Sequence, residues 1–199
     1  MITISHPRIY NMHILSIFSL TLIGLATAGP VKRDLATVKA AFANITNALN
    51  QLDTDVNALN TNSNIADTVA TLNSDANNVI TALNTGTANI DATSALSLSD
   101  AINLASVAQG LGTTVNNTIN DLIAKEPIIN SSGNDPLVVS ELQAQYSATQ
   151  AFINAVASKV PSVVSGIAKK EGQTALNSIN KGIVAFGGTA KSKKLKRNF

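Results

Sequence analysis

The chain has 199 residues and no cysteine, and its two histidines, His6 and His13, lie close to its start. Once that start is removed neither imidazole nor thiol remains, which excludes hydrolases of the Ser-His or Cys-His type and zinc sites built from His and Cys. The net charge of +2 hides an acidic body, since residues 34–190 carry six lysines against twelve carboxylates, and such a body argues against nucleic acid as a partner.

The first 28 residues have the features of a secretory signal peptide. A mildly basic start with Arg8 precedes the apolar run from Ile14 to Leu25, which is shorter than the roughly 20 residues that a membrane-spanning helix needs. The sequence Ala26-Thr27-Ala28 is typical of the site after which a signal peptide is cut. We therefore expect a secreted protein without a transmembrane anchor.

Residues 29–33 are predicted to be a short propeptide. They end in Lys32-Arg33, a pair typical of the sites that Golgi processing proteases cut. Cleavage there leaves Asp34 as the first residue of the mature chain, and its side chain is suited to cap a helix. A single domain is expected over residues 34–188, followed by a disordered basic tail over residues 189–199.

Residues 34–59 form the first predicted element, an amphipathic helix. Its apolar residues follow one another at intervals of three and four, which keeps them on one side of a helix. They are Leu35, Val38, Phe42, Ile45, Leu49, Leu52, Val56 and Leu59. A helix with one apolar side needs partners that cover it, so the rest of the chain is expected to pack around this element.

Four more helices are predicted downstream, over residues 65–94, 100–125, 136–160 and 162–186. Gly86 is expected inside the first of these and Ser162 at the start of the last, where it caps the helix. Residues 128–135 are predicted to be the main loop, because Pro127 ends the helix before it and the segment is rich in Asn, Ser and Gly.

The apolar sides of these helices should form the core. Ile102 in the third helix and Val163 and Ile167 in the fifth belong to the apolar stripes and are therefore expected to face inward. No segment has a convincing strand pattern. The fold is predicted to be all-α, a single-domain bundle of about five amphipathic helices.

The carboxylates do not form a recognisable catalytic pair. Asp53 and Asp55 are two residues apart and point to different sides of a helix, and Asp67 and Asp75 lie two turns apart on a surface stripe. The chain also lacks tryptophan, which would stack on sugars. We predict that the protein is not an enzyme, with no catalytic residue, metal or cofactor, and that its charged residues are solvated.

Three sequences match the acceptor motif for N-glycosylation, at Asn44, Asn116 and Asn130. Asn44 lies opposite the apolar stripe, Asn116 follows the core residue Val115, and Asn130 lies in the predicted loop. All three asparagines are therefore expected at the surface. The alternative for each of the three asparagines is that the motif is present but the side chain is never glycosylated.

The apolar stripes allow two interpretations. A close-packed core is the simpler one. In the other, five helices with few aromatic side chains enclose an apolar pocket for an acyl chain, or open and lay their apolar faces on an oily interface. The sequence pattern alone leaves both interpretations open.

The order of these features resembles the fungal hydrophobic surface binding protein A family, to which the cell-wall galactomannoproteins are similar. The resemblance rests on the signal peptide, the Lys32-Arg33 pair, the heptad helix that begins at Asp34, and residues 122–133 and 142–161. It implies a secreted or cell-wall-associated helical protein without catalysis, which adsorbs to hydrophobic surfaces or holds fatty acids inside its bundle. It also implies secreted hydrolases or cell-wall polysaccharide as further partners.

We therefore predict a secreted, glycosylated protein that binds lipids, fatty-acid-like ligands or hydrophobic surfaces through an apolar pocket or face. Residues in the middle of the stripes are the candidates for its lining: Phe42, Leu49, Leu72, Val115, Leu142, Phe152, Ile179 and Ile183. The alternative is a structural cell-wall mannoprotein or surface antigen with a solid core. A connected apolar cavity would favour the first prediction, and continuous close packing the second.

Overall fold

The computed structural model describes residues 30–61 and 64–191. These residues form six helices: α1 (Pro30–Ala58), α2 (Ile65–Asp91), α3 (Leu98–Ala124), α4 (Glu126–Ser131), α5 (Asp135–Lys159) and α6 (Ser162–Ala185). The expected all-α, single-domain fold is confirmed. The predicted signal peptide, its cleavage after Ala28 and the end of the basic tail lie outside the described residues.

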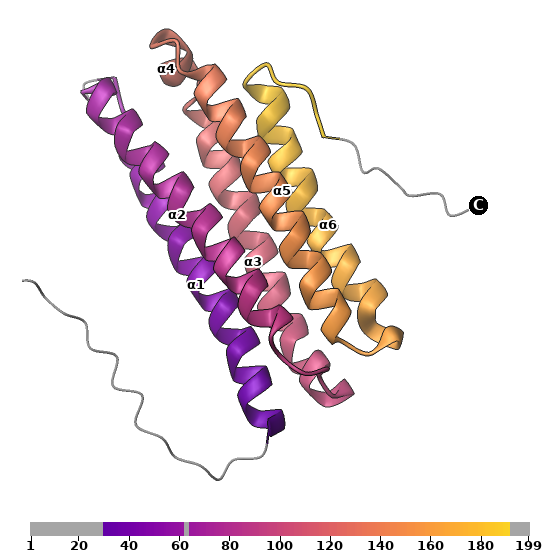
Figure 1. Cartoon of the computed structure of the whole chain (residues 1–199). Helices are drawn as coiled ribbons and strands as arrows, with labels where there is room; N and C mark the ends of the chain where they lie inside the picture. Colours follow the sequence, from indigo (N-terminus) through magenta and orange to yellow (C-terminus); the bar gives the residue numbers. More distant parts are fainter. Residues whose placement is uncertain (1–29, 62–63, 192–199) are drawn as a thin grey trace, which may run out of the picture.

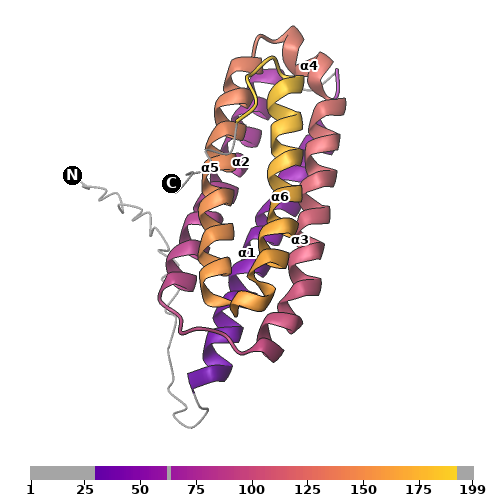
Figure 2. The same ribbon diagram turned by 90° about the vertical axis from the view of Figure 1, so that its right-hand side faces the viewer.

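The five long helices run along a common axis, and α4 lies across one end of the bundle (Figure 1). We call this the α4 end; the opposite end, which holds the α2–α3 connection and Pro161, is the Pro161 end. Figure 2 looks onto α5, α6 and α3, which stand side by side. Each long helix packs mainly against two neighbours, in the order α1, α2, α5, α6, α3 and back to α1.

This closed ring of five helices has a consequence for the centre of the bundle. Neighbouring packed helices lie about 8–10 Å apart, so a regular ring of five places each helix axis about 7–8.5 Å from the centre. Most of the buried side chains are those of Val, Leu, Ile and Ala. The large rings buried among them in the described residues are Phe42, Tyr146, Phe152 and Phe186. Short aliphatic side chains do not reach across such a ring, so space remains along its axis.

Two lysines tie the ends of the long helices together. Neither α1 nor α2 has a basic residue in its last turn. Lys125, which follows α3, donates to the carbonyls of Asn57 at 3.1 Å and Leu59 at 2.8 Å. Lys159, at the end of α5, donates to the carbonyls of Asp91 at 2.9 Å and Thr93 at 2.7 Å. Each ammonium group thus satisfies the carbonyls that a helix leaves unpaired at its C-terminus.

The local signals in the sequence account for several helix boundaries. Ser97 caps α3, because its Oγ accepts a hydrogen bond from the amide of Asp100 at 3.1 Å. The helix α2 continues through Gly86 as expected, and a Cβ on this glycine would lie 3.1 Å from the Phe152 ring and 3.2 Å from Ala41. Gly86 therefore lets α2 approach α1 and α5 closely.

Three predicted boundaries were wrong. The segment expected to be the main loop contains α4, because Pro127 fits the first turn of a helix and the buried Ile129 holds that turn against the core. Helix α1 begins at Pro30 rather than Asp34. Pro161, not Ser162, precedes α6, and no side chain caps its first turn.

The start of the segment predicted to be a disordered tail contacts α6. Asn180 of α6 accepts a hydrogen bond from the amide of Lys191 at 2.8 Å and donates to the carbonyl of Lys191 at 3.0 Å. Gly187, with φ of +80°, ends the helix before this contact. Lys191 is therefore bonded to α6, and disorder of the tail stays a prediction.

The predicted core is wrong at the Pro161 end. Ile102, Val163 and Ile167 were expected to face inward, but they are 61%, 75% and 55% exposed. They lie in the first turns of α3 and α6, where no further helix covers them. None of the described helices is both long enough and apolar enough to cross a membrane.

Candidate functional site: an apolar cavity along the bundle axis

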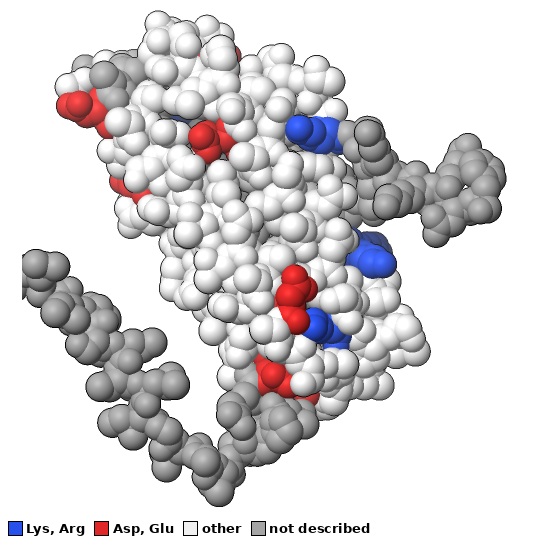
Figure 3. Space-filling view, in the orientation of Figure 1, with Lys and Arg blue, Asp and Glu red and all other residues white. Residues whose placement is uncertain are grey.

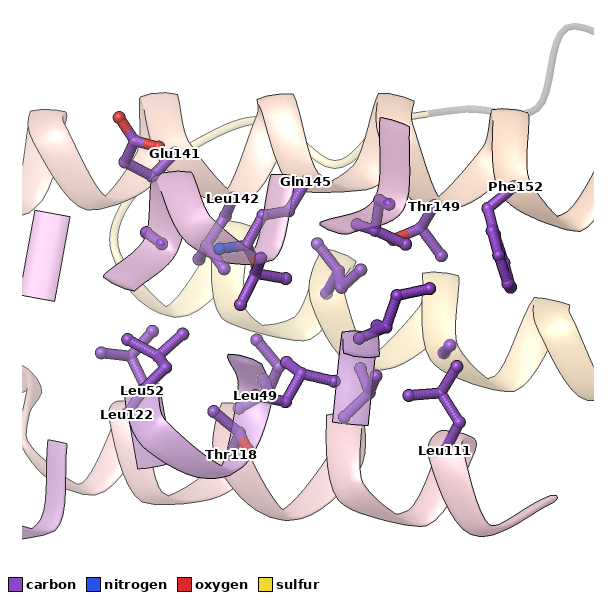
Figure 4. Close-up of a pocket in the computed structure, with 18 of the residues that line it drawn as sticks. Leu49, Leu52, Leu111, Thr118, Leu122, Glu141, Leu142, Gln145, Thr149 and Phe152 are labelled. Atoms are coloured by element: carbon purple, nitrogen blue, oxygen red, sulfur yellow. The ribbon is translucent and has the colours of Figure 1, made fainter. Parts of the chain in front are cut away.

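A cavity of about 130 Å³ lies inside the ring, with walls from all five long helices (Figure 4). By the same measure a single water molecule needs about 10–15 Å³, so the cavity has room for on the order of ten water-sized groups. Aliphatic side chains make up most of its wall. A mainly aliphatic wall of this kind favours an apolar guest. The presence of this cavity argues against the alternative prediction of a structural wall mannoprotein with a solid core.

Seven of the eight residues predicted to line a pocket lie in the wall of this cavity. They are Phe42, Leu49, Leu72, Val115, Leu142, Phe152 and Ile179. The rings of Phe42 and Phe152 meet edge to face, with their centroids 5.1 Å apart. That these residues contact a ligand stays a prediction.

The eighth residue, Ile183, does not line the cavity. It is fully buried near the C-terminal end of α6, where its carbonyl accepts a hydrogen bond from the amide of Gly188 at 2.8 Å. A Cβ on Gly188 would lie 2.8 Å from a methyl group of Ile183. Ile183 is therefore covered by the turn that follows α6.

Three buried polar side chains also face the cavity, and the sequence analysis assigned a site role to none of them. Thr118 on α3 and Gln145 on α5 are 2% and 4% exposed, and Thr149 is one turn beyond Gln145. The hydroxyl of Thr118 makes no hydrogen bond of good geometry, although it lies beside the carboxylate of Asp53 and lowers the pKa of that group. Within the described residues the side chains of Gln145 and Thr149 have no hydrogen-bond partner. An unpaired polar group inside a protein costs free energy, which a ligand that pairs with it would recover.

Figure 4 shows how these groups are arranged. Glu141, Gln145, Thr149 and Phe152 follow one another along α5, and Thr118 and Leu122 lie across the cavity from them. The interval of four residues from Glu141 to Gln145 to Thr149 puts all three side chains on one face of α5. This interval within an otherwise apolar stripe is the signal in the sequence that could have identified them.

The charged groups of the wall are all acidic. Glu141 and Glu171 are the charged residues that line the cavity, and no Lys or Arg is among the described lining residues. One carboxylate oxygen of Glu141 is buried without a partner, and burial raises the pKa of this side chain. Asn73 and Asn134 add neutral polar groups to the wall.

Further buried carboxyl groups lie nearer the α4 end. Burial raises the pKa of Asp53 and Asp75, and the neighbouring carboxylates of Asp121 and Asp55 raise them further. Burial also raises the pKa of Asp135, with a contribution from Glu126. The α4 half of the bundle is therefore rich in carboxyl groups that lack a cationic partner. Among the described residues no cluster of His, Cys, Asp and Glu is arranged to hold a metal ion.

A second chamber of about 120 Å³ adjoins the cavity at the Pro161 end. It lies between α3, α5 and α6, and its wall includes Ile102 and Ile167. Five residues border both spaces: Phe42, Ala108, Val156, Ala168 and Glu171. The apolar space therefore continues from the centre of the bundle toward the partly exposed start of α3 and α6.

The predicted modification sites lie on the outside of the bundle. Asn44, Asn116 and Asn130 are all exposed, on α1, α3 and α4. Asn130 donates to the carboxylate of Glu126 at 3.0 Å, and Asn116 accepts from the hydroxyl of Ser178 at 3.1 Å. Glycosylation stays a prediction, as does cleavage after Lys32-Arg33, a pair that falls within the first turns of α1.

Comparison with known proteins identifies the family. The family model described as hydrophobic surface binding protein A matches residues 35–158, which is more than half of the chain. The chain belongs to the hydrophobic surface binding protein A family. The cavity lies within the residues that match the family model, except for the part of its wall that α6 contributes.

Relatives among characterised proteins are fungal cell-wall proteins. Cell wall mannoprotein 1 of Aspergillus fumigatus is 32% identical over 114 residues, which are 57% of this chain and 40% of the relative. Cell wall mannoprotein 1 of Aspergillus flavus is 28% identical over 176 residues, which are 88% of this chain and 63% of the relative. The chain thus spans less than two thirds of either relative.

A solved structure with the same fold contains a lipid. Ligand binding domain 1 of the Penicillium marneffei MP1 protein, complexed with arachidonic acids, aligns with 78% of this chain and 99% of its own length. The two are 30% identical and superpose with a TM-score of 0.73.

Proposed function

We propose that this protein is a non-catalytic carrier that holds a long-chain lipid of the fatty-acid class inside its helical bundle. The single observation that carries the proposal is the apolar cavity enclosed by α1, α2, α3, α5 and α6, with unpaired polar groups in its wall. The solved domain of MP1 that shares this fold binds arachidonic acids. Family membership and the relatives among wall mannoproteins support a secreted or cell-wall location.

The distribution of polar groups gives the bound lipid a direction. Asn73, Thr118, Glu141 and Gln145 face the cavity, whereas the wall toward the Pro161 end consists mainly of apolar residues such as Phe42, Ala108 and Val156, with Glu171 as its charged residue. The lipid head group would lie between Gln145 and Thr118, which supply amide and hydroxyl donors. The aliphatic chain would extend past Phe42 and Phe152 toward the second chamber.

The proposal includes no reaction and no cofactor. The described lining contains Thr and Glu but no Ser, Cys, Lys or His. The proposal also includes secreted hydrolases or cell-wall polysaccharide as partners. They would contact the outer surface of the bundle and not the cavity.

The direct test is mass spectrometry of lipids extracted from the secreted protein, followed by titration of the stripped protein with a fatty acid. We expect a long-chain lipid in the extract and saturable binding afterwards. Gln145→Leu and Thr118→Val should each weaken binding about tenfold or more, because each removes a hydrogen bond to a charged or polar head group. Gln145→Leu should leave the fold no less stable, since it removes a buried polar group without a partner. Thr118→Val also removes the hydroxyl beside Asp53, so its stability is measured together with its binding.

Thr113→Val is the matched control on α3. The Thr113 side chain is exposed and donates to the carbonyl of Gln109 at 3.1 Å, so its replacement should leave binding unchanged. An extract without lipid, together with no saturable binding by the stripped protein, would sink the proposal and leave the structural wall mannoprotein.

A further inference from the structure

Four of the five large apolar residues that are exposed in the described structure gather at the start of α3 and α6. Leu98 and Ile102 of α3 are 47% and 61% exposed, and Val163 and Ile167 of α6 are 75% and 55% exposed. We call these four residues the α3/α6 patch. Because α3 and α6 pack against each other and run in the same direction, their first turns lie together at the Pro161 end. A cluster of exposed apolar side chains on a small protein indicates an interaction surface.

The patch is continuous with the interior. Ile102 and Ile167 belong both to the patch and to the wall of the second chamber, which in turn shares five residues with the main cavity. Ala105, Ala108 and Ala168 also line this chamber. The alanines leave room between the patch and the main cavity, and Phe42 is the large ring that borders both spaces.

Two exposed lysines flank the patch and would attract an anionic partner locally, although the body as a whole is acidic. Lys169 and Lys170 follow Ile167 on α6, and both are exposed and without a partner among the described residues. The nearby Asp100 is bonded to Ser97, and Glu171 is partly buried against the chamber. Elsewhere the bundle surface in Figure 3 carries only scattered charged side chains. Exposed apolar side chains flanked by lysines are the composition of surfaces that lie on anionic membranes.

We propose that the α3/α6 patch docks on an anionic lipid bilayer and is the entrance through which lipid reaches the cavity. This inference rests on the proposed carrier function. In a bilayer the head group lies at the surface and the chain points inward, so a lipid withdrawn through the patch enters head first. Its head group then arrives at Gln145 and Thr118, and its chain fills the space toward the Pro161 end.

The test separates docking from binding. Leu98→Glu/Val163→Glu changes two patch residues that do not line either cavity. The full chain is mixed with vesicles of phosphatidylcholine and phosphatidylglycerol that carry a fluorescent fatty acid, and co-sedimentation and transfer rate are measured. We expect wild-type protein to co-sediment in a salt-dependent way, and the double variant to lose about tenfold or more in both vesicle binding and transfer rate. Its equilibrium affinity for monomeric fatty acid should equal that of the wild type.

Two further variants complete the design. Val184→Glu on α6 replaces an apolar residue that is 56% exposed but lies outside the patch, and it should behave as wild type. Lys169→Glu/Lys170→Glu should reduce binding to anionic vesicles while binding to pure phosphatidylcholine vesicles stays the same. If vesicle binding by the wild type depends neither on salt concentration nor on the phosphatidylglycerol content, the proposal of an anionic partner is wrong.

Other outcomes overturn the entrance itself. Equal losses of vesicle binding in Val184→Glu and in Leu98→Glu/Val163→Glu would contradict the entrance. A dimer in solution that buries the patch would contradict it too. If the stripped protein binds monomeric fatty acid but never contacts vesicles, the entrance is wrong and the carrier function stands. If it binds neither, the carrier function itself fails.

Discussion

Buried carboxyl groups are the residue-scale feature that departs most from an ordinary helical core. One oxygen each of Asp53, Asp75, Asp135 and Glu141 is buried without a hydrogen-bond partner. Burial raises the pKa of all four, and neighbouring carboxylates raise that of Asp53, Asp75 and Asp135 further. Each therefore destabilises the folded state when it is ionised.

The sign of the resulting pH dependence follows from linkage. A carboxyl group whose pKa is raised by folding binds a proton more readily in the folded state than in the unfolded one. The free energy of unfolding should therefore increase as the pH falls from neutral toward the ordinary values of 3.8 for Asp and 4.5 for Glu. This gain in stability should be lost as the pH rises through the raised pKa values of the folded state.

Thermal unfolding at pH 5 and pH 7 measures this effect. We expect the midpoint to be higher at pH 5, and the difference to shrink in Asp75→Asn and in Glu141→Gln. Asp91→Asn, which changes an exposed residue, should keep the wild-type difference. A midpoint that falls on acidification in parallel for all four proteins would show that these buried groups do not control the pH dependence.

At the same scale, the sequence predicted the apolar wall better than its polar groups. Periodicity alone places Phe42, Leu49 and Leu142 on inward faces, and the cavity lies where those faces meet. It does not distinguish a residue beside the cavity from one such as Ile183, which a later turn covers. Gln145 was missed because a polar residue in a helix is ordinarily assigned to the solvent side.

At the scale of elements, the helices were predictable where local chemistry marks their ends and not where tertiary contacts decide. Ser97 marks the start of α3, and Pro161 marks the end of α5. Helix α4 was missed because the composition of this segment, rich in Asn and Ser, is typical of a loop. The burial of Ile129 stabilises the helical turn instead. The two lysine contacts to the ends of α1 and α2 join residues more than 60 positions apart, which no local pattern reveals.

These lysine contacts lead to a prediction about stability. Lys125→Met and Lys159→Met should each lower the free energy of unfolding by about 1–2 kcal/mol, because the charge-assisted bonds to the helix-end carbonyls are lost while the aliphatic stem is kept. Lys39→Met on α1 changes an exposed lysine and should cost less than about 0.5 kcal/mol. Chemical denaturation measures the differences. Equal values for all three variants would contradict the role assigned to the two lysines.

At the scale of the whole molecule, the order of the helices around the ring creates the cavity. Five amphipathic helices are compatible with a solid core as well as a hollow one, so the sequence left this point open. The ring α1, α2, α5, α6, α3 decides it, because short aliphatic side chains do not fill the centre of five packed helices. The same arrangement leaves the first turns of α3 and α6 without cover.

Two glycines on α3 allow the interior of the bundle to be tested separately from its surface. A Cβ at Gly110 or at Gly112 would meet no atom within 4 Å, so a side chain can start at either position without a clash at its Cβ. Gly112 lies in the cavity wall with Ala108, Leu111 and Val115, whereas Gly110 is exposed. Replacing either glycine should stabilise the helix by up to about 1 kcal/mol.

The measurement that tests the central claim most directly is a titration of Gly112→Leu, Gly110→Leu and the wild type with the same long-chain fatty acid. A leucine at Gly112 fills the cavity, so we predict that this variant stays folded and loses affinity by about tenfold or more, since the bound chain would have to displace the new side chain. Gly110→Leu should bind as the wild type does. Equal affinity and stoichiometry in all three proteins would place the lipid outside the bundle and contradict the account.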